Sequence, residues 1–320
     1  MDKSTHSVGK GKRFPHLYLE ITRACNLFCP HCFNYSSSNS EMTMSLDDAK
    51  LILNNFVKAG GKSLQVTGGE SFTHKNLFEI LEYARDVEIE YIILSTNGTL
   101  CSREDIKRVH DITDEVYLSI DGFERENDRI RGKGGFIKTC NVLDELIEYN
   151  HKVSVYTSLT PLVFGYIEEF VEWLIKKGVY FVNFSPIGTV GRGQKKNEDL
   201  HFSQDEYGEI YQKIRRLERK YVQKIRIAQP LTKIVEQIDF SKEDWVCNPK
   251  GELGILIGGD ICDEWILGNA KEEFVFSGEK LKRYIKIMND LLYNYSKTSE
   301  CQTVHVWELM VNMLRDMQHK

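Results

Sequence analysis

The sequence lacks the features that would tie it to a membrane, a secretory route or a nucleic acid. No run of about 18 consecutive apolar residues occurs in the 320-residue chain, which argues against a transmembrane helix. The polar, basic stretch from Met1 to His16 has no apolar core of the kind that a signal peptide needs. The net charge of −5 argues against a dedicated nucleic-acid-binding protein, which is expected to be basic. We therefore expect a cytoplasmic protein whose partners include no membrane and no nucleic acid.

The chain also lacks internal repeats of the solenoid type and low-complexity tracts. Hydrophobic residues make up 41% and charged residues 28%, which is the balance of an ordinary globular protein. A chain of this length buries a full core without covalent cross-links. Its eight cysteines are therefore expected to be free, metal-binding or catalytic rather than paired in disulfides.

Short apolar, β-branched runs alternate with segments of helical period from residue 17 onwards. The predicted strands are 17–21, 63–66, 91–94, 115–120, 153–158 and 180–185. The helices predicted between them are 46–58, 76–86, 103–110, 136–149 and 165–177. Alternating strands and helices indicate right-handed βαβ units and a parallel sheet. Six units are too few for a closed eight-unit barrel, so the sequence predicts an α/β fold with an open, partial (β/α)6 barrel of the TIM type.

Composition shifts divide the chain into regions. We predict a flexible leader at 1–15, the partial barrel at 16–193, a charged helical connection at 194–246 and a small C-terminal α+β domain at 247–320. The connection contains a charged amphipathic helix at 203–224. The last region contains a hairpin at 251–262, followed by helices near 272–294 and 303–318.

Polar and glycine-rich residues follow several of the predicted strands. They are Thr67–Glu70 after the second strand, Ser95–Gly98 at the end of the third and Ser119–Gly122 at the end of the fourth. Each cluster alone is an ordinary turn signal. In a parallel α/β barrel, however, the loops at the carboxyl ends of the strands form the active-site face. The clusters together favour a functional site at that rim.

Three cysteines directly follow the first predicted strand, as Cys25-x3-Cys29-x2-Cys32. Zinc prefers four ligands, so three thiolates on one loop leave a tetrahedral zinc site incomplete. In a 4Fe-4S cluster, three cysteines can hold three irons and leave the fourth open for another ligand. The spacing therefore favours an iron–sulfur cluster over structural zinc and over incidental buried thiols.

This spacing, with His31 before the last cysteine, resembles the radical S-adenosylmethionine (SAM) enzymes. Further stretches similar to that family are Gly68-Gly69-Glu70, Ser119–Gly122, Asp128–Gly132, Gly135-Phe136 and Phe184–Gly193. The likeness covers about 17–193. It implies that the open iron binds SAM, that one electron cleaves the sulfonium, and that the resulting 5′-deoxyadenosyl radical takes a hydrogen from a substrate.

The resemblance also implies the cofactor-binding residues. They are Cys25, Cys29 and Cys32 for the cluster, and His31, Gly68, Gly69, Glu70, Asn97, Ser119, Asp121 and Arg131 for SAM. Glycine allows close backbone approach, and a carboxylate such as Glu70 suits the SAM ammonium group. A guanidinium such as Arg131 is a natural bidentate partner of the SAM carboxylate. The alternatives are a solvated charge for Arg131 and a plain turn at Asp121-Gly122.

The C-terminal cysteines Cys247, Cys262 and Cys301 resemble those of the SPASM or twitch extensions of the same family. The low cysteine count favours the shorter twitch form, with a single auxiliary iron–sulfur cluster. Two alternatives are buried thiols without a cluster and a zinc site completed by His305. Cys101 and Cys140 are expected to lie in the core.

Family members with such extensions mostly modify ribosomally made peptides, so we predict a peptide substrate that is crosslinked, joined through a thioether or epimerised. It is expected to lie across the open side of the barrel, against 251–269 and along an exposed strand edge. A separate leader-binding partner and a flavodoxin- or ferredoxin-type electron donor are further expectations. The alternatives are a dehydrogenase or decarboxylase of an aminocyclitol, sugar or nucleoside, and a non-catalytic iron–sulfur or zinc protein.

Overall fold

The computed structural model describes residues 16–33, 35–58, 61–187, 191–194, 199–203, 206–227 and 252–255. Eight strands of this part form one parallel sheet, in the order β7-β6-β5-β4-β3-β2-β1-β8. They are β1 His16–Glu20, β2 Ser63–Thr67, β3 Tyr91–Thr96, β4 Glu115–Ser119, β5 Lys152–Leu159, β6 Phe181–Pro186, β7 Arg226–Ile227 and β8 Glu252–Ile255. The strands β1 to β6 lie side by side in chain order, as successive βαβ units require.

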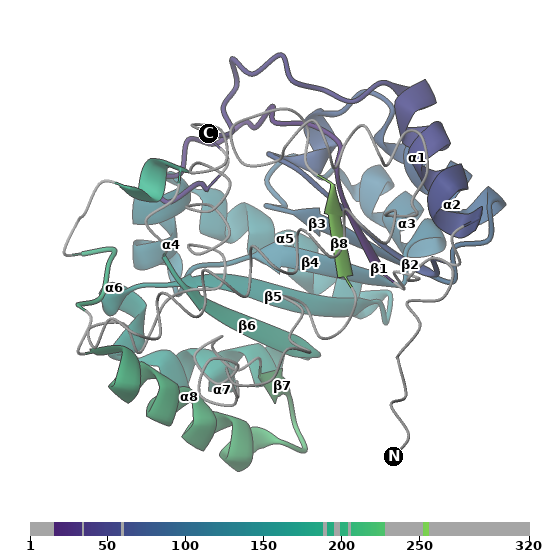
Figure 1. The fold of residues 1–320 in the computed structure, drawn as a ribbon. Coiled ribbons are helices and arrows are strands. Elements are labelled where there is room, and N and C mark those ends of the chain that lie inside the picture. Colours follow the sequence, from purple (N-terminus) through teal and green to yellow (C-terminus); the bar gives the residue numbers. More distant parts are fainter. Residues whose placement is uncertain are drawn as a thin grey trace, which may run out of the picture.

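Helices connect these strands and cover the outer face of the curved sheet (Figure 1). They are α1 Leu46–Lys58, α2 Leu77–Asp86, α3 Arg103–Ile112, α4 Glu124–Arg131, α5 Gly135–Glu148, α6 Pro161–Phe164, α7 Ile167–Lys177 and α8 Glu206–Tyr221, with short 3-10 turns η1 Ser71–Thr73 and η2 Gly191–Gln194. The predicted α/β partial barrel is thus confirmed, and the charged helix predicted at 203–224 is α8.

Side chains along each strand alternate between two environments, because successive residues of a strand point to opposite faces of a sheet. On β4, Val116 and Leu118 are buried in the core under the helices, whereas Tyr117 is half-buried on the other face. Tyr156 on β5 is also half-buried, and its ring centroid lies 4.8 Å from that of Tyr117. The outer face of the sheet therefore holds the core, and the inner face presents aromatic and polar groups.

Two short strands extend the sheet beyond the six that the sequence predicts. The strand β8 pairs with β1 from His16 opposite Glu252 to Leu19 opposite Ile255. The strand β7 pairs with β6 only at Phe181 and Val182. The first strand of the hairpin predicted at 251–262 thus belongs to the barrel sheet and covers the edge of β1.

Helix α4 is a difference between prediction and structure, because the sequence analysis assigned no helix to it. Its signals are nevertheless present: Glu124 and Glu126 in the first turn, Arg129 and Arg131 in the last, and Gly132 beyond it with a φ of +110°. Its buried residues are only two, so an apolar helical stripe is missing. The helix matters because it places Arg131 at the rim of the barrel.

Several predictions fall on residues outside the described ranges. They concern the leader at 1–15, most of the connection beyond 227, the second half of the hairpin, the helices near 272–294 and 303–318, and Cys247, Cys262, Cys301 and His305. Among the described helices, none is both long and apolar enough to cross a membrane.

Candidate functional site

The cysteine loop begins where β1 ends, at the carboxyl rim of the sheet. Cys25 and Cys29 are buried and Cys32 is half-buried. The Cys25 amide donates to the Ser37 carbonyl at 3.0 Å, and the Cys32 amide donates to the Cys29 carbonyl at 3.2 Å. Burial raises the pKa of Cys25 to about 12 and also raises the pKa of Cys29. These thiols can therefore become thiolates only when a bound metal or nearby cations compensate the charge.

Two cations face this loop and favour the thiolate form of its cysteines. Arg131 and Arg192 both lower the pKa of Cys29, against the larger effect of burial. Within the described residues, no three His, Cys, Asp or Glu side chains converge closely enough to hold one metal ion. The cysteines of a 4Fe-4S cluster each bind a different iron, so they need not converge on one point. The three thiols and their facing guanidinium groups fit such a cluster better than a single zinc ion.

Gly68 and Gly69, predicted as SAM-binding residues, make a close backbone contact with the start of the cysteine loop. A Cβ atom on Gly68 would lie 2.4 Å from the Thr22 carbonyl oxygen, and one on Gly69 would lie 2.3 Å from that of Ala24. The φ of Gly68 is +157°, which L residues rarely adopt. The Gly69 amide donates to the Thr22 carbonyl at 2.7 Å. The two glycines therefore dock the loop after β2 onto the loop after β1.

Glu70 is fully buried and already has protein partners. Its carboxylate accepts hydrogen bonds from the Thr96 hydroxyl at 2.6 Å, the Asn97 amide at 2.7 Å and the Phe72 amide at 3.1 Å. Burial raises the pKa of Glu70, and these three hydrogen bonds act against that rise. The side chain thus joins the end of β2 to the end of β3 and orders the loop that carries Asn97.

Asn97 belongs to a small amide and hydroxyl network around the first cysteine. Its Nδ2 donates to the Asn26 side-chain oxygen at 3.0 Å and lies 4.0 Å from the Cys25 sulfur. The Asn26 amide group in turn donates to the Thr99 hydroxyl at 2.8 Å. Asn97 therefore fixes the cysteine loop against β3.

Three of the predicted SAM-binding residues lie together: Asp121, Arg131 and His31. Asp121 is fully buried, and its Oδ2 lies 2.8 Å from Arg131 Nε and 3.8 Å from His31 Nε2. Asp121 Oδ2 and Arg131 Nε are each other's partner in this buried ion pair, whereas His31 Nδ1 has no hydrogen-bond partner among the described residues. A buried polar atom without a partner is costly, so this group is suited to a polar ligand.

Charges within this group influence one another. Burial opposes the charge of Arg131, but the Asp121 carboxylate beside it raises its pKa, so it stays a cation. Burial lowers the pKa of His31 to about 4, which leaves its ring neutral at pH 7. The Asp121 Oδ1 accepts from the Ser158 amide at 2.7 Å, which fixes the carboxylate that orients Arg131. Ser119 is half-buried at the end of β4, on the same rim.

Sequence reasoning missed some residues that build the site. Thr96 and Asn26 hold Glu70 and Asn97 in place, and Asn127 accepts a hydrogen bond from the Asp121 amide at 2.9 Å. Arg192 contacts the cysteine loop from the end of β6. The motif that contains Arg192 was visible in the sequence, but no sequence signal connects positions 163 residues apart.

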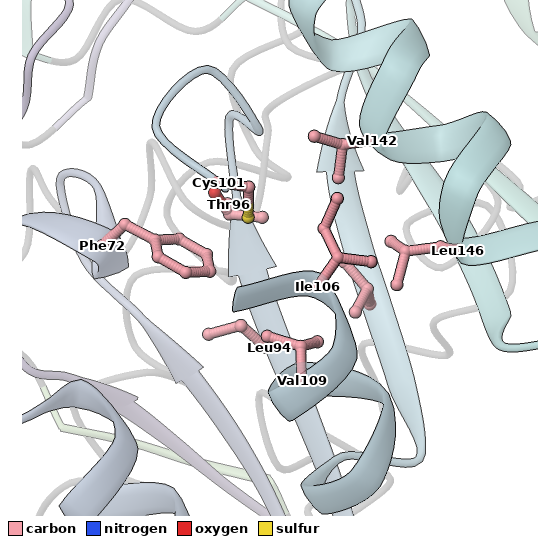
Figure 2. Close-up of a pocket in the computed structure, with 9 residues that line it drawn as sticks. Phe72, Leu94, Thr96, Cys101, Ile106, Val109, Val142 and Leu146 are labelled. Carbon is pink, nitrogen blue, oxygen red and sulfur yellow. The ribbon is translucent and has the colours of Figure 1, made fainter. Parts of the chain in front are cut away.

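Cys101 lies among the side chains drawn in Figure 2, together with Leu94 and Thr96 of β3, Ile106 and Val109 of α3 and residues of α5. The gap among these side chains has no room for a water molecule, so it is a packing gap and not a ligand pocket. Burial raises the pKa of Cys101, which packs against the core as expected. Cys140, on α5, is half-buried.

The fold and the site define an α/β protein with three cysteines on one loop at the carboxyl rim of an open parallel barrel. Residues 19–177 match the Radical SAM superfamily, and through them the chain belongs to this family of enzymes, which use a 4Fe-4S cluster and SAM. The resemblance to the radical SAM enzymes noted at about 17–193 is thereby confirmed, and the twitch-type extension stays a prediction.

Individual relatives differ in what their names describe. The Fe-coproporphyrin III synthase of Methanosarcina barkeri is 30% identical over 58% of this chain and 47% of its own length. The antilisterial bacteriocin subtilosin biosynthesis protein AlbA of Bacillus subtilis is 28% identical over 60% of this chain and 44% of its own. The chain thus spans about half the length of these relatives.

One solved structure shares the fold. It is Streptococcus suis SuiB bound to the precursor peptide SuiA, with a TM-score of 0.63 and 18% identity over 93% of this chain and 71% of that one. An identity this low supports the fold alone.

Proposed function

We propose that the protein binds a 4Fe-4S cluster through Cys25, Cys29 and Cys32 and uses it with SAM to abstract hydrogen from a ribosomally made peptide. One observation carries this proposal: the three thiols lie on one loop at the rim, facing two guanidinium groups, inside the segment that matches the superfamily. When bound, the cluster and SAM supply an electron and a 5′-deoxyadenosyl radical, which is the chemistry of the cofactors.

The residues of the chain bind and orient these groups. The three cysteines hold three irons and leave one open. Arg131, held by Asp121, and Ser119 receive the SAM carboxylate, since a guanidinium pairs well with two carboxylate oxygens. Glu70 keeps Asn97 and the first cysteine in register, and it leaves lone pairs for the SAM ammonium group.

A peptide substrate is supported by two kinds of relative. AlbA is described as a bacteriocin biosynthesis protein, and SuiB has been solved with a precursor peptide. The inner face of the sheet, with half-buried Tyr117 and Tyr156, offers aromatic and polar contacts below the rim. We propose crosslinking, thioether formation or epimerisation as the reaction, with a separate leader-binding partner and a flavodoxin- or ferredoxin-type electron donor, in the cytoplasm.

We further propose that Cys247, Cys262 and Cys301 hold one auxiliary iron–sulfur cluster in a twitch-type domain. Three cysteines can hold such a cluster when another group occupies the remaining iron.

The main alternative is a small-molecule substrate, and the similarity to a coproporphyrin synthase favours it. A small ligand needs a mostly pre-formed pocket, whereas an extended peptide needs a longer groove. Hydrogen–deuterium exchange with and without a candidate peptide separates the two. Protection near 253–262 and along a barrel strand supports the peptide, and protection limited to the strand-end loops supports the small molecule.

The central test replaces Cys25, Cys29 and Cys32 together with Ala. The reduced wild-type protein should be brown when purified without oxygen and should cleave SAM to 5′-deoxyadenosine, and the triple variant should not cleave it. The matched control is Cys101→Ala with Cys140→Ala, which removes two half-buried cysteines outside the site. SAM cleavage that persists in the triple variant contradicts the proposal.

The same triple variant also tests the auxiliary cluster. About four irons should remain bound to it if the C-terminal cysteines hold a cluster. Complete loss of iron would instead favour buried thiols at those positions.

A further inference from the structure

The rim of the barrel is closed by a contact between its first and last loops. In the sheet, four strands separate β1 from β6, and β6 pairs only with β5 and β7. The backbone amide of Arg192, in η2 after β6, nevertheless donates to the Cys32 carbonyl at 2.9 Å. Its side-chain Nε donates to the Cys29 carbonyl at 2.8 Å. The loop after β6 therefore meets the cysteine loop after β1.

The residue before Arg192 shows that this contact is built for close approach. Gly191 has a φ of +58°, and a Cβ atom on it would lie 2.2 Å from the Phe33 carbonyl oxygen and 2.3 Å from that of Cys32. Only glycine avoids a clash with backbone at such distances. The η2 turn therefore rests directly on the backbone around the last cysteine.

The guanidinium of Arg192 has a second contact on the same loop. It lies over the Phe28 ring, 4.0 Å from the ring centroid, although Phe28 itself is 69% exposed. A guanidinium is planar, so it can stack on an aromatic ring while its N–H groups donate hydrogen bonds in that plane. A lysine ammonium is a point charge and has no such plane. Arg192 thus touches the loop between the first and second cysteines and, through its Nε, the second cysteine itself.

The position of the charge has a consequence for a bound cluster. Reduction adds negative charge to a thiolate-bound cluster, and surrounding charge and hydrogen bonds set its reduction potential. The Arg192 Nε lies 2.8 Å from the Cys29 carbonyl oxygen, so its positive charge lies beside the second cysteine, whereas Arg131 already has Asp121 as its ion-pair partner. Among the described residues, no carboxylate forms an ion pair with Arg192.

We propose that Arg192 is a positioning residue for the iron–sulfur cluster: it holds the cysteine loop closed across the open side of the barrel, and its charge favours the reduced cluster. This inference rests on the proposed cluster at Cys25, Cys29 and Cys32. Through Arg192, the loop after β6 would then contribute directly to the cluster site that follows β1.

The test compares Arg192→Gln and Arg192→Lys with wild-type protein, all as the full chain reconstituted without oxygen. The control is Arg129→Gln, which removes an exposed arginine that pairs with Asp199 on the surface. Two properties are measured. One is the rate at which a chelator removes iron from the cluster, and the other is the midpoint potential of the electron paramagnetic resonance signal that changes when SAM is added.

The Gln variant should lose iron about tenfold faster than wild type, the scale typical of residues that support metal ligands. Its midpoint potential should shift to more negative values, because a cation near the reduced cluster is gone. The Lys variant keeps the charge and loses the planar contact, so its potential should stay near wild type while its iron loss is intermediate. The Arg129→Gln protein should match wild type in both properties.

Equal iron loss and equal potential in the wild type and the Gln variant would overturn the inference. Faster iron loss with an unchanged potential would overturn the charge effect alone. Thermal unfolding of the apo-proteins identifies a Gln variant that fails to fold, in which case the Lys variant decides. A wild-type protein without a SAM-responsive signal would instead refute the proposed function.

Discussion

The two ends of the sheet each bury a carboxylate beside a cation, but they satisfy it in different ways. At the amino-terminal end, Glu115 accepts from the Tyr91 hydroxyl at 2.6 Å and from the Ser154 hydroxyl, and Lys152 Nζ lies 3.0 Å away. At the carboxyl rim, Asp121 accepts from the Ser158 amide at 2.7 Å and pairs with Arg131 at 2.8 Å, but the Nδ1 of the neighbouring His31 has no hydrogen-bond partner among the described residues. The polar groups named at the amino-terminal end all have protein partners, whereas those at the rim do not.

The difference indicates which end is built for stability and which for a ligand. A fully satisfied buried network makes a structure rigid, whereas unpaired buried groups are costly unless something else meets them. Proteins tolerate unpaired buried polar groups of this kind at functional sites. The three predictions below test this contrast, from the largest expected effect to the smallest.

The largest effect is expected at the rim, for Arg131→Lys. The lysine keeps the positive charge beside Asp121, so the thermal unfolding midpoint should change by only a few degrees. It cannot pair with two carboxylate oxygens at once, so SAM cleavage should fall about 100-fold, equivalent to about 2.7 kcal/mol. The rate of 5′-deoxyadenosine formation and the iron content are measured together. Wild-type cleavage by this variant would show that Arg131 does not receive the SAM carboxylate.

The sequence predicted most of the barrel because its signals are local. Alternating residues such as Val116 and Leu118 mark a strand whatever lies beside it. Close approach at Gly68 was also foreseeable from the residue type, but its partner, the Thr22 carbonyl, was not. Sequence patterns do not reveal which distant segments meet, so the contact of Arg192 with Cys29 and the pairing of β8 with β1 required the structure.

The second effect is expected at the opposite end, for Glu115→Gln. The amide keeps the shape of the side chain but removes the charge beside Lys152 and weakens the hydrogen bonds from Tyr91 and Ser154. The free energy of unfolding should fall by about 1–2 kcal/mol, as for other charge-assisted hydrogen bonds. Urea denaturation measures this loss. The folded variant should cleave SAM at the wild-type rate, and a large loss of cleavage with intact stability would contradict the division of roles.

The smallest effect is a pH dependence at the same end of the sheet, from His151, the residue before β5. The ring is buried, with its Nε2 3.3 Å from the Thr113 hydroxyl and its Nδ1 3.4 Å from His110 Nδ1. Burial, and then His110, lower the pKa of His151 to about 4. Since this pKa lies below the ordinary value of 6.5, the unfolded chain binds a proton first as the pH falls.

The contribution of His151 to stability is therefore complete above pH 6.5 and is lost between pH 6.5 and pH 4. At one pH unit below the unfolded pKa this loss is about 1.4 kcal/mol. In His151→Gln, an amide that does not titrate can still hydrogen-bond Thr113, so the variant should lose less stability than wild type between pH 7.5 and 5.5. Urea denaturation of the apo-proteins at both pH values measures the difference. Parallel losses in the two proteins would mean that the imidazole is protonated in the folded state, and that this end of the sheet tolerates a buried charge as the rim does.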